Sequence, residues 1–453
     1  MAQLKVVKTA LAAGLIGAFA VTSSGRAIAQ EAIEGKGVEV SPGTVLHPNV
    51  GAELGFIDNI FYESENKISS GLLRLTAKFD VASAKIEPDE PIPGDDEPGN
   101  EAAPQTFQFR AGGGFRYEEY LYYDNPNASA QRNLAFDTQA HLQVYPAGTW
   151  SFVADDRLVR DIRPRNYEDS TSTNRIDNLL DVGLRFQPGG HSISGTLRYR
   201  NVLDVFEGSA GVPNRMDHTI GLRGDWQWLP FTRFFADLSY GFYGALGDST
   251  IGTAGLTKHS SNPLRGVVGV ATTLTPPMTL KAQLGWAWMP YESTAGYAGT
   301  SHNAPIVDVE FGYEYAPTGR AIVEYSYDAQ DSTNADYFRD HKVTFRVEQQ
   351  LIDKLLLSGS IDLRLRGYRG VDPILNGNVD GMASSTRDDF IFAGHARAQY
   401  VLTERYYVTG EYTGSVDQTD FRYDTTSPTG PQRMNDDPGY VRHELMFGAR
   451  AAF

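Results

Sequence analysis

The end of the chain, residues 441–453, constrains the fold more than any other stretch. Its odd positions carry Val441, His443, Leu445, Phe447, Ala449, Ala451 and Phe453, and its even positions carry Arg442, Glu444, Met446, Gly448 and Arg450. This period of two predicts a β-strand with one face in an apolar medium and the other in water. No following segment could cover the apolar face, so we expect the medium to be lipid. Backbone groups in lipid must all be hydrogen-bonded, which requires a closed barrel in which this last strand pairs with the first.

The same alternation recurs along most of the chain. We predict strands at 50–56, 73–81, 106–122, 131–145, 149–160, 175–187, 190–204, 215–228, 231–244, 264–275, 278–289, 304–316, 319–328, 340–350, 355–367, 387–402, 405–414 and 440–453. The pattern predicts an all-β fold, a transmembrane antiparallel β-barrel of about 18 strands over residues 45–453. The even strand count is expected when both ends of a single-chain bacterial barrel share one side of the membrane.

The connections between these strands are alternately short and long. The short ones, at 145–148, 187–190, 228–231, 275–278, 316–319, 351–354 and 402–405, mostly contain proline or glycine, as tight turns do. The long ones, such as 245–263, 367–386 and 415–439, are polar. Outer-membrane barrels have short periplasmic turns and long extracellular loops, whereas a soluble sandwich or propeller has no reason to alternate in this way.

Five tryptophans fit two interfacial belts. Trp150, Trp226 and Trp228 lie beside short turns, while Trp286 and Trp288 lie near a long loop. Aromatic side chains gather where a membrane meets water, so the two sets indicate the periplasmic and extracellular interfaces.

Residues 1–29 have the three parts of a secretory signal peptide. Lys5 and Lys8 precede the apolar run 10–21, and a small-residue site ends at Ala29, where we expect cleavage. The apolar run is too short to span a membrane as a helix. The chain contains no cysteine, which excludes disulfides, thiolate metal sites and a lipid-modified cysteine.

Two further segments are not expected to contribute wall strands. Residues 30–44 read as a flexible periplasmic lead, and residues 85–105 form an acidic, proline-rich insert that cannot bury a core. We interpret the insert as disordered, with docking of a periplasmic partner as the alternative. The net charge of −16 argues against a nucleic-acid partner.

Strand parity places two groups of arginines toward the lumen, on nearly opposite walls, with four acids between them. The pore-lining candidates are Arg185, Arg198, Arg200, Arg223, Arg346, Arg364, Arg366, Arg397, Asp308, Glu310, Glu314 and Glu324. Two readings stay open. The arginines can orient polar or anionic solutes in a water-filled pore, or they can brace the wall by pairing with lumen acids such as Asp137, Asp181, Asp225 and Asp362.

The extracellular loops carry an excess of acids, which predicts a weak cation preference at low salt. The prominent ones are Glu63, Glu65, Asp331, Asp336, Asp417, Asp420, Asp436 and Asp437. Charges on a vestibule raise the local concentration of counter-ions only within a Debye length.

Neither of the two candidate chemical sites is convincing. Residues 376–381 imitate the first half of a calcium loop, but Arg387 occupies the position of the bidentate glutamate. His259 with Ser260 is a pair of residue types found in hydrolases, but adjacent residues of an extended chain point apart. We therefore expect no enzyme activity, no catalytic, cofactor or metal site, and no cofactor.

The stretch Gly55-Phe56-Ile57-Asp58-Asn59-Ile60-Phe61 resembles the opening of poorly characterised outer-membrane β-barrel porin families of Gram-negative bacteria. Some members of these families look like the barrel partners of exopolysaccharide export systems. The resemblance covers the mature chain in architecture and this short motif in sequence, and the acidic insert is a departure from it. It also implies that the barrel-assembly machinery reads the aromatic end of the chain, through Phe453, Phe447 and Leu445.

These observations predict a porin-like channel for polar solutes in the bacterial outer membrane. The barrel of an exopolysaccharide export system is one form of that function. The alternative is a structural or adhesive barrel with a closed lumen. The expected partners are outer-membrane lipids, lipopolysaccharide and the barrel-assembly machinery, to which an export role would add periplasmic export components.

Overall fold

The structure is a computed structural model, described here for residues 37–41, 44–83, 106–122, 128, 132–162, 174–189, 192–207, 213–247, 259–293, 299–333, 335–371, 378–379, 382–422 and 437–453. A single antiparallel sheet of nineteen strands contains β1 and the eighteen strands of a barrel wall. No helix in the described ranges is long and apolar enough to cross a membrane.

The strand bounds follow the chain in order. They are β1 Val38–Ser41, β2 Thr44–Ile57, β3 Ser70–Ala82, β4 Phe107–Tyr120, β5 Asn133–Val144, β6 Trp150–Asp161, β7 Arg175–Phe186, β8 Ile193–Phe206, β9 Arg215–Leu229, β10 Thr232–Ala245, β11 Leu264–Thr275, β12 Met278–Pro290, β13 Ser301–Ala316, β14 Gly319–Asp331, β15 Tyr337–Ile352, β16 Leu355–Arg369, β17 Asn378–Val379, β18 Met382–Ala383, β19 Thr386–Val401, β20 Tyr406–Thr419, β21 Phe421–Arg422 and β22 Tyr440–Ala452.

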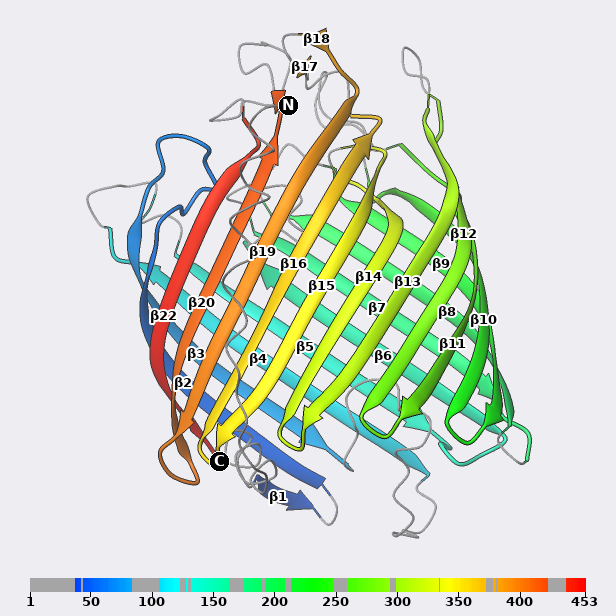
Figure 1. The fold of residues 1–453 in the computed structure, drawn as a ribbon, viewed down its shortest axis with the longest axis horizontal. Helices are drawn as coiled ribbons and strands as arrows, with labels where there is room; N and C mark the ends of the chain where they lie inside the picture. The colour runs from blue at the N-terminus through cyan, green and yellow to red at the C-terminus, as the bar shows by residue number, and fades with distance from the viewer. Residues whose placement is uncertain are drawn as a thin grey trace.

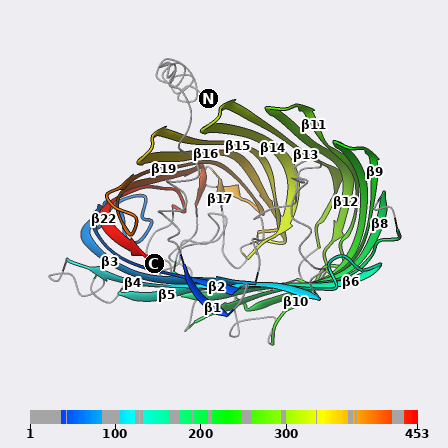
Figure 2. The ribbon, with the colours of Figure 1, turned by 90° about the horizontal axis from the view of Figure 1, so that it is seen from below.

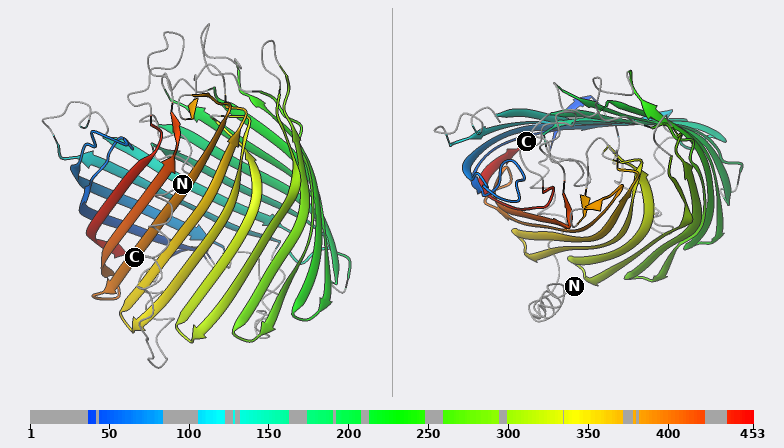
Figure 3. Two further views of the ribbon diagram at one scale, coloured as in Figure 1. Left: turned by 45° about the horizontal axis from the view of Figure 1, so that its top comes forward. Right: turned by 90° about the horizontal axis from the view of Figure 1, so that it is seen from above.

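Each wall strand pairs with its neighbours in the chain, and β2 pairs with β22 to close the ring. The strands are tilted, and the C-terminus and β1 lie at the end that carries the short turns (Figure 1). Seen from below, the barrel is a flattened ring (Figure 2). One long side contains β3, β4 and β5, and the other contains β14, β15 and β16, as the view from above also shows (Figure 3).

The eighteen predicted wall strands are confirmed, because each predicted range overlaps one observed strand. The largest boundary error is at β2, which begins at Thr44 rather than at residue 50. Four short strands were missed: β1 and the three strands of a small sheet, β17, β18 and β21, in the extracellular loops.

The lead at 30–44 is not wholly without regular structure, which corrects that expectation. Its residues Val38–Ser41 form β1, which pairs antiparallel with the start of β2. The predicted signal peptide at 1–29 and the acidic insert at 85–105 lie outside the described residues. Of the calcium-like loop at 376–381, only Asn378–Val379 is described.

The two faces of the wall differ in polarity, as the alternation predicts. Within the wall strands, exposed large apolar side chains lie on the outward face, for example Leu222, Leu365 and Phe447. All five tryptophans are also exposed. A closed barrel with an apolar outer face and charged inner face is a membrane-spanning barrel of the bacterial outer membrane.

A buried ionic cluster lies across the closing pair of strands. Arg74 on β3 contacts Glu118 on β4 at 2.9 Å, Glu53 on β2 at 3.3 Å, and Glu444 on β22. Arg450 donates from Nε to Glu53 at 3.1 Å. We call these five residues the seam cluster. Because it joins β2, β3, β4 and β22, it binds the first strands of the barrel to the last.

The motif that begins at Gly55 fastens the first extracellular loop to the same closure. Asn59 is fully buried and donates to the carbonyl oxygen of Val441 at 2.9 Å, while Asp58 accepts the backbone N–H of His443 at 2.6 Å. A Cβ on Gly55 would lie 2.0 Å from the carbonyl oxygen of Leu445, so no other residue fits there without a backbone shift.

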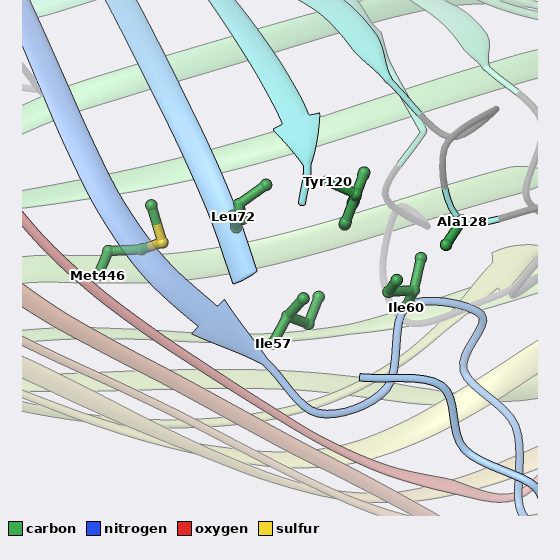
Figure 4. Packing of buried hydrophobic residues seen from close by; sticks show 6 residues of the cluster. All are labelled: Ile57, Ile60, Leu72, Tyr120, Ala128 and Met446. Atoms are coloured by element: carbon green, nitrogen blue, oxygen red, sulfur yellow. The ribbon is translucent and has the colours of Figure 1, made fainter. Parts of the chain in front are cut away.

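An apolar cluster lies on the inner side of the wall beside this loop. It consists of Ile57, Ile60, Leu72, Tyr120, Ala128 and Met446, whose side chains are shown in Figure 4. Loop residues Ile60 and Ala128 therefore fold inward over the extracellular end of β2, β3 and β4. We call this group the apolar cap.

We predict that Arg74→Leu destabilises the folded barrel by about 3–5 kcal/mol, because it leaves buried carboxylates without their shared cation. The free energy of unfolding is measured by denaturant titration in detergent. Arg110→Leu is the matched control, since its 2.9 Å pair with Asp80 is only partly buried and is expected to cost less than about 1 kcal/mol. Equal losses in the two variants would show that the seam cluster has no special part in closure.

We predict that Leu363 faces lipid and Arg364 faces the lumen, since they alternate on β16. Single cysteines at the two positions are treated with a membrane-impermeant thiol reagent. The cysteine at 364 should react much faster than the cysteine at 363. Similar rates would mean that the register of β16 is wrong.

Candidate functional site: the charged lumen

The first lumen cavity lies beside the seam cluster and has a volume of about 640 Å³. Side chains from β3, β4 and β5 on one wall and from β16, β19, β20 and β22 on the other line it. Seven of them are cationic and four are anionic: Arg74, Lys78, Arg116, Arg364, Arg397, Arg442 and Arg450 against Asp137, Asp362, Glu411 and Glu444. Lys78 is exposed and forms no ion pair within the described part of the chain. This seam-side cavity therefore presents surplus positive charge.

The second lumen cavity has a volume of about 460 Å³ and is lined mainly by strands β7 to β11, β13 and β14. Its charges are nearly balanced, with Arg198, Arg200, Arg215, Arg223 and Arg265 against Asp217, Asp237, Asp328 and Asp331. Arg215 on β9 bonds Asp331 on β14 at 2.9 Å. Because four strands separate β9 from β14 in the wall, this pair bridges the extracellular end of the lumen.

Most arginines of the first predicted group have acidic partners. Arg198 pairs with Asp237 at 3.1 Å, Arg200 with Asp181 at 2.6 Å, and Arg223 with Asp225 at 3.1 Å. Arg185 lies on β7 with lumen-facing parity, and no ion pair to a described residue is seen for it. The first three contacts agree with the wall-bracing reading.

The second predicted group is also largely paired. Arg346 lies 2.9 Å from Glu324 and 3.1 Å from Glu310, and Arg364 lies 3.4 Å from Asp362. Arg397 reaches Glu411 only at 4.0 Å, and its Nε is buried without a hydrogen-bond partner. Asp308 and Glu314 are on β13 with lumen-facing parity, and Glu314 is exposed.

Arg366 is a correction to the predicted pore lining. Its side chain is completely buried, bonds both oxygens of Asp340 at 2.7 and 2.8 Å, and lies 3.9 Å from the ring centroid of Phe338. The alternation of side chains along β16 correctly predicted that Arg366 points to the inner side of the wall, but neighbouring side chains exclude water from it. It therefore braces the extracellular end of β15 and β16.

Three of the predicted vestibule acids are likewise buried. Asp331 and Asp336 are 8% and 1% exposed, and Asp417 is 3% exposed. Asp331 bonds Arg215, and Asp417 lies 3.4 Å from Arg387. These carboxylates do not act as free vestibule charges, so the acidic vestibule is weaker than the sequence indicates.

Polar loop residues form a second cap over the lumen. Asp336 accepts hydrogen bonds from His259 Nδ1 at 2.8 Å and from the Thr300 hydroxyl at 2.5 Å, and Tyr291 donates to Asp331 at 2.9 Å. Burial, followed by the charge of Asp331, raises the pKa of Tyr291 well above its ordinary value, so this phenol stays a donor. We call these five residues the polar cap.

The polar cap gives His259 a structural role. Its side chain is buried and hydrogen-bonded to Asp336, whereas the histidine of a hydrolase would lie beside an accessible nucleophile. No group of three or more metal-ligating side chains lies together within the described ranges.

Sequence reasoning missed several lumen cations. Arg74, Lys78, Arg116, Arg215, Arg442 and Arg450 all line the two cavities. The same parity rule could have found them, because they occupy the inward positions of predicted strands. Pairs such as Arg74 with Glu444 and Arg215 with Asp331 could not be found, since they link strands that are not adjacent in the sequence.

No protein-family model matches this sequence, and no curated protein matches it. Among solved structures, the chain is similar to the outer membrane protein OpdK from Pseudomonas aeruginosa, with 9% identity and a TM-score of 0.43 over 90% of this chain and 99% of that one. It is also similar to OpdQ from the same organism, with 10% identity and a TM-score of 0.41 over 92% and 99% of the two chains. A third is the FrpB iron transporter from Neisseria meningitidis, with 8% identity and a TM-score of 0.45 over 94% and 83%. At these identities and scores, the assignment of the fold rests on the barrel's own strands.

Proposed function

We propose that this protein is a porin-like channel that passes polar solutes across the outer membrane. The observation that carries the proposal is the pair of charged cavities, of about 640 and 460 Å³, inside a closed barrel. A lumen lined by ionic side chains stabilises water and polar solutes and excludes apolar ones.

The seam-side cavity gives the channel a preference among polar solutes. Lys78 and Arg397 face it with little or no carboxylate contact, whereas most other lumen cations are paired. A solute with an anionic group would therefore be favoured on this side of the lumen. An acidic exopolysaccharide segment is one solute class with this chemistry, and export of such a polymer is the narrower form of the proposal.

The two caps favour a second candidate function, a structural or adhesive barrel with a closed lumen. The apolar cap buries Ile57 and Leu72 completely, and the polar cap joins loop residues to Asp331 at the end of β14 and to Asp336 just before β15. Both groups occupy the extracellular end. If they obstruct the lumen permanently, the charged side chains below them only brace the wall.

Conductance in a planar lipid bilayer separates the two functions. We predict that the wild-type protein conducts, and that His259→Ala with Asp336→Ala raises the single-channel conductance, because the double variant releases the polar cap. Arg160→Gln with Glu207→Gln is the matched control, since this bidentate pair at 2.6 and 2.7 Å lies on the outward face. Absence of conductance in both the wild-type and the released variant would favour the closed barrel.

The lumen arginines should influence ion selectivity. Because the seam-side cavity has more cations than anions and three of the vestibule acids are buried, we now predict a weak anion preference at low salt in place of the cation preference expected from the sequence. The preference should fade as ionic strength rises and the Debye length falls toward about 8 Å. Replacing Arg198, Arg200, Arg364 and Arg397 with glutamine should shift the selectivity toward cations, because the substitutions remove positive charge from both cavities.

Reversal potentials across a salt gradient measure the effect. Arg160→Gln on the outward face controls for a change in overall charge. An unchanged reversal potential in the quadruple variant would identify these arginines as wall braces away from the conduction path.

A further inference from the structure

Three tyrosine–histidine pairs recur with the same geometry around the barrel. They are Tyr199 with His218, Tyr325 with His341, and Tyr412 with His443, and each hydroxyl lies 2.7–3.0 Å from the histidine Nδ1. Ring centroids are 6.0, 6.4 and 6.0 Å apart, with interplanar angles of 27°, 28° and 21°. The three pairs join β8 to β9, β14 to β15, and β20 to β22.

The three pairs share one cross-strand register. Each tyrosine is opposite an apolar residue, namely Ile220, Val343 or Leu445, and the histidine lies two residues nearer the extracellular end. Those three apolar residues are exposed on the outward face. Side chains two residues apart share a face, so all three histidines face outward as well.

The histidines also share one depth. They are the fourth residue of β9, the fifth of β15 and the fourth of β22, counted from the extracellular ends. Exposed apolar side chains continue below them toward the periplasm. The pairs therefore lie at the extracellular interface of the membrane, where the outer-leaflet headgroups begin.

Three histidines in the lumen or the loops have carboxylate partners: His141, His259 and His395 lie 2.7, 2.8 and 3.5 Å from them. The buried His302 is an exception, because its Nε2 has no hydrogen-bond partner among the described residues. The three outward histidines have a phenol instead, and no ion pair joins their rings to an acid in the described ranges. The Asp58 carboxylate near His443 is bound to the backbone N–H rather than to the ring.

This arrangement leaves Nε2 of each outward histidine as the ring nitrogen that the phenol does not contact. When the phenol donates to Nδ1, the proton of the neutral ring is on Nε2. At His218, the Asn201 side-chain amide nitrogen also lies 3.2 Å from Nδ1 and can only donate, which favours the same tautomer. If the ring is protonated, the phenol oxygen accepts from Nδ1 and Nε2 still donates.

We propose that the three pairs form a binding belt for the phosphate groups of outer-leaflet lipid. A phosphate is the strong anionic acceptor at this depth, and the ring N–H at Nε2 is a donor that can bind it. Within the described residues, no lysines cluster on the outward face at this depth, so the histidines supply the donors. The belt would thereby set the depth of the barrel in the membrane.

The test uses the full-length barrel in detergent, with bisphosphorylated lipid A or the same lipid without its phosphates. Lipid affinity is obtained from the rise in the thermal unfolding midpoint with lipid concentration. Wild type should bind the phosphorylated lipid more tightly. Replacing His218, His341 and His443 with asparagine keeps a partner for each phenol but removes the outward donor, and should weaken binding about threefold for each histidine.

Three comparisons make the result specific. Glutamine, which returns a donor near the Nε2 position, should restore most of the affinity, and the lumen variant His141→Asn with His395→Asn should bind like wild type. Inorganic phosphate at the same concentration should not raise the midpoint. If it does, the belt binds free phosphate rather than lipid and the proposal is wrong.

An unchanged preference for phosphorylated lipid in the triple asparagine variant would overturn the proposal and leave the pairs as packing residues. If the triple variant does not fold, the single variant His341→Asn provides the same comparison with a threefold expected loss.

Discussion

Pairing between β2 and β22 is the constraint on which the rest of the structure depends. Without it, two strand edges would expose backbone donors and acceptors to lipid, at a cost of several kcal/mol for each group. The seam cluster lies behind this pairing and joins four strands through Arg74. The loop motif adds Asn59, which ties the first extracellular loop to β22. Closure is therefore secured by backbone, ionic and loop contacts together.

Closure also decides what the lumen can do. It brings β3, β4 and β5 opposite β16, β19 and β20, so that cations from both walls line one cavity. In the interior, most of these charges are paired, and paired charges stabilise a wall more than they attract a solute. Lys78 and Arg397 stand out because their carboxylate contacts are absent or weak. The preference of the lumen for one class of solute thus depends on the few cations with weak or absent carboxylate contacts rather than on the total charge.

The extracellular end is organised differently from the wall. Apolar and polar caps cover parts of the lumen from within, while the tyrosine–histidine pairs face outward at the headgroup level. Buried acids such as Asp336 bind loop residues on the inner side. The outward histidines bind phenols instead, and they form no ion pair with an acid in the described part of the chain. The extracellular end therefore combines inward-folded loop residues with outward-facing tyrosine–histidine pairs.

The sequence by itself determined the number of wall strands, their inward and outward faces and the alternation of turns and loops. These follow from a period of two and from turn residues, which are local properties of the chain. Only the tertiary structure decided that Arg366 is buried and that Arg215 forms an ion pair with Asp331. It also decided that three tyrosines contact a histidine on the neighbouring strand, two residues beyond the directly opposite position. Those contacts depend on strand register and barrel closure, which bring together residues far apart in sequence. Parity predicts the face on which a side chain lies, but not the partner it finds there.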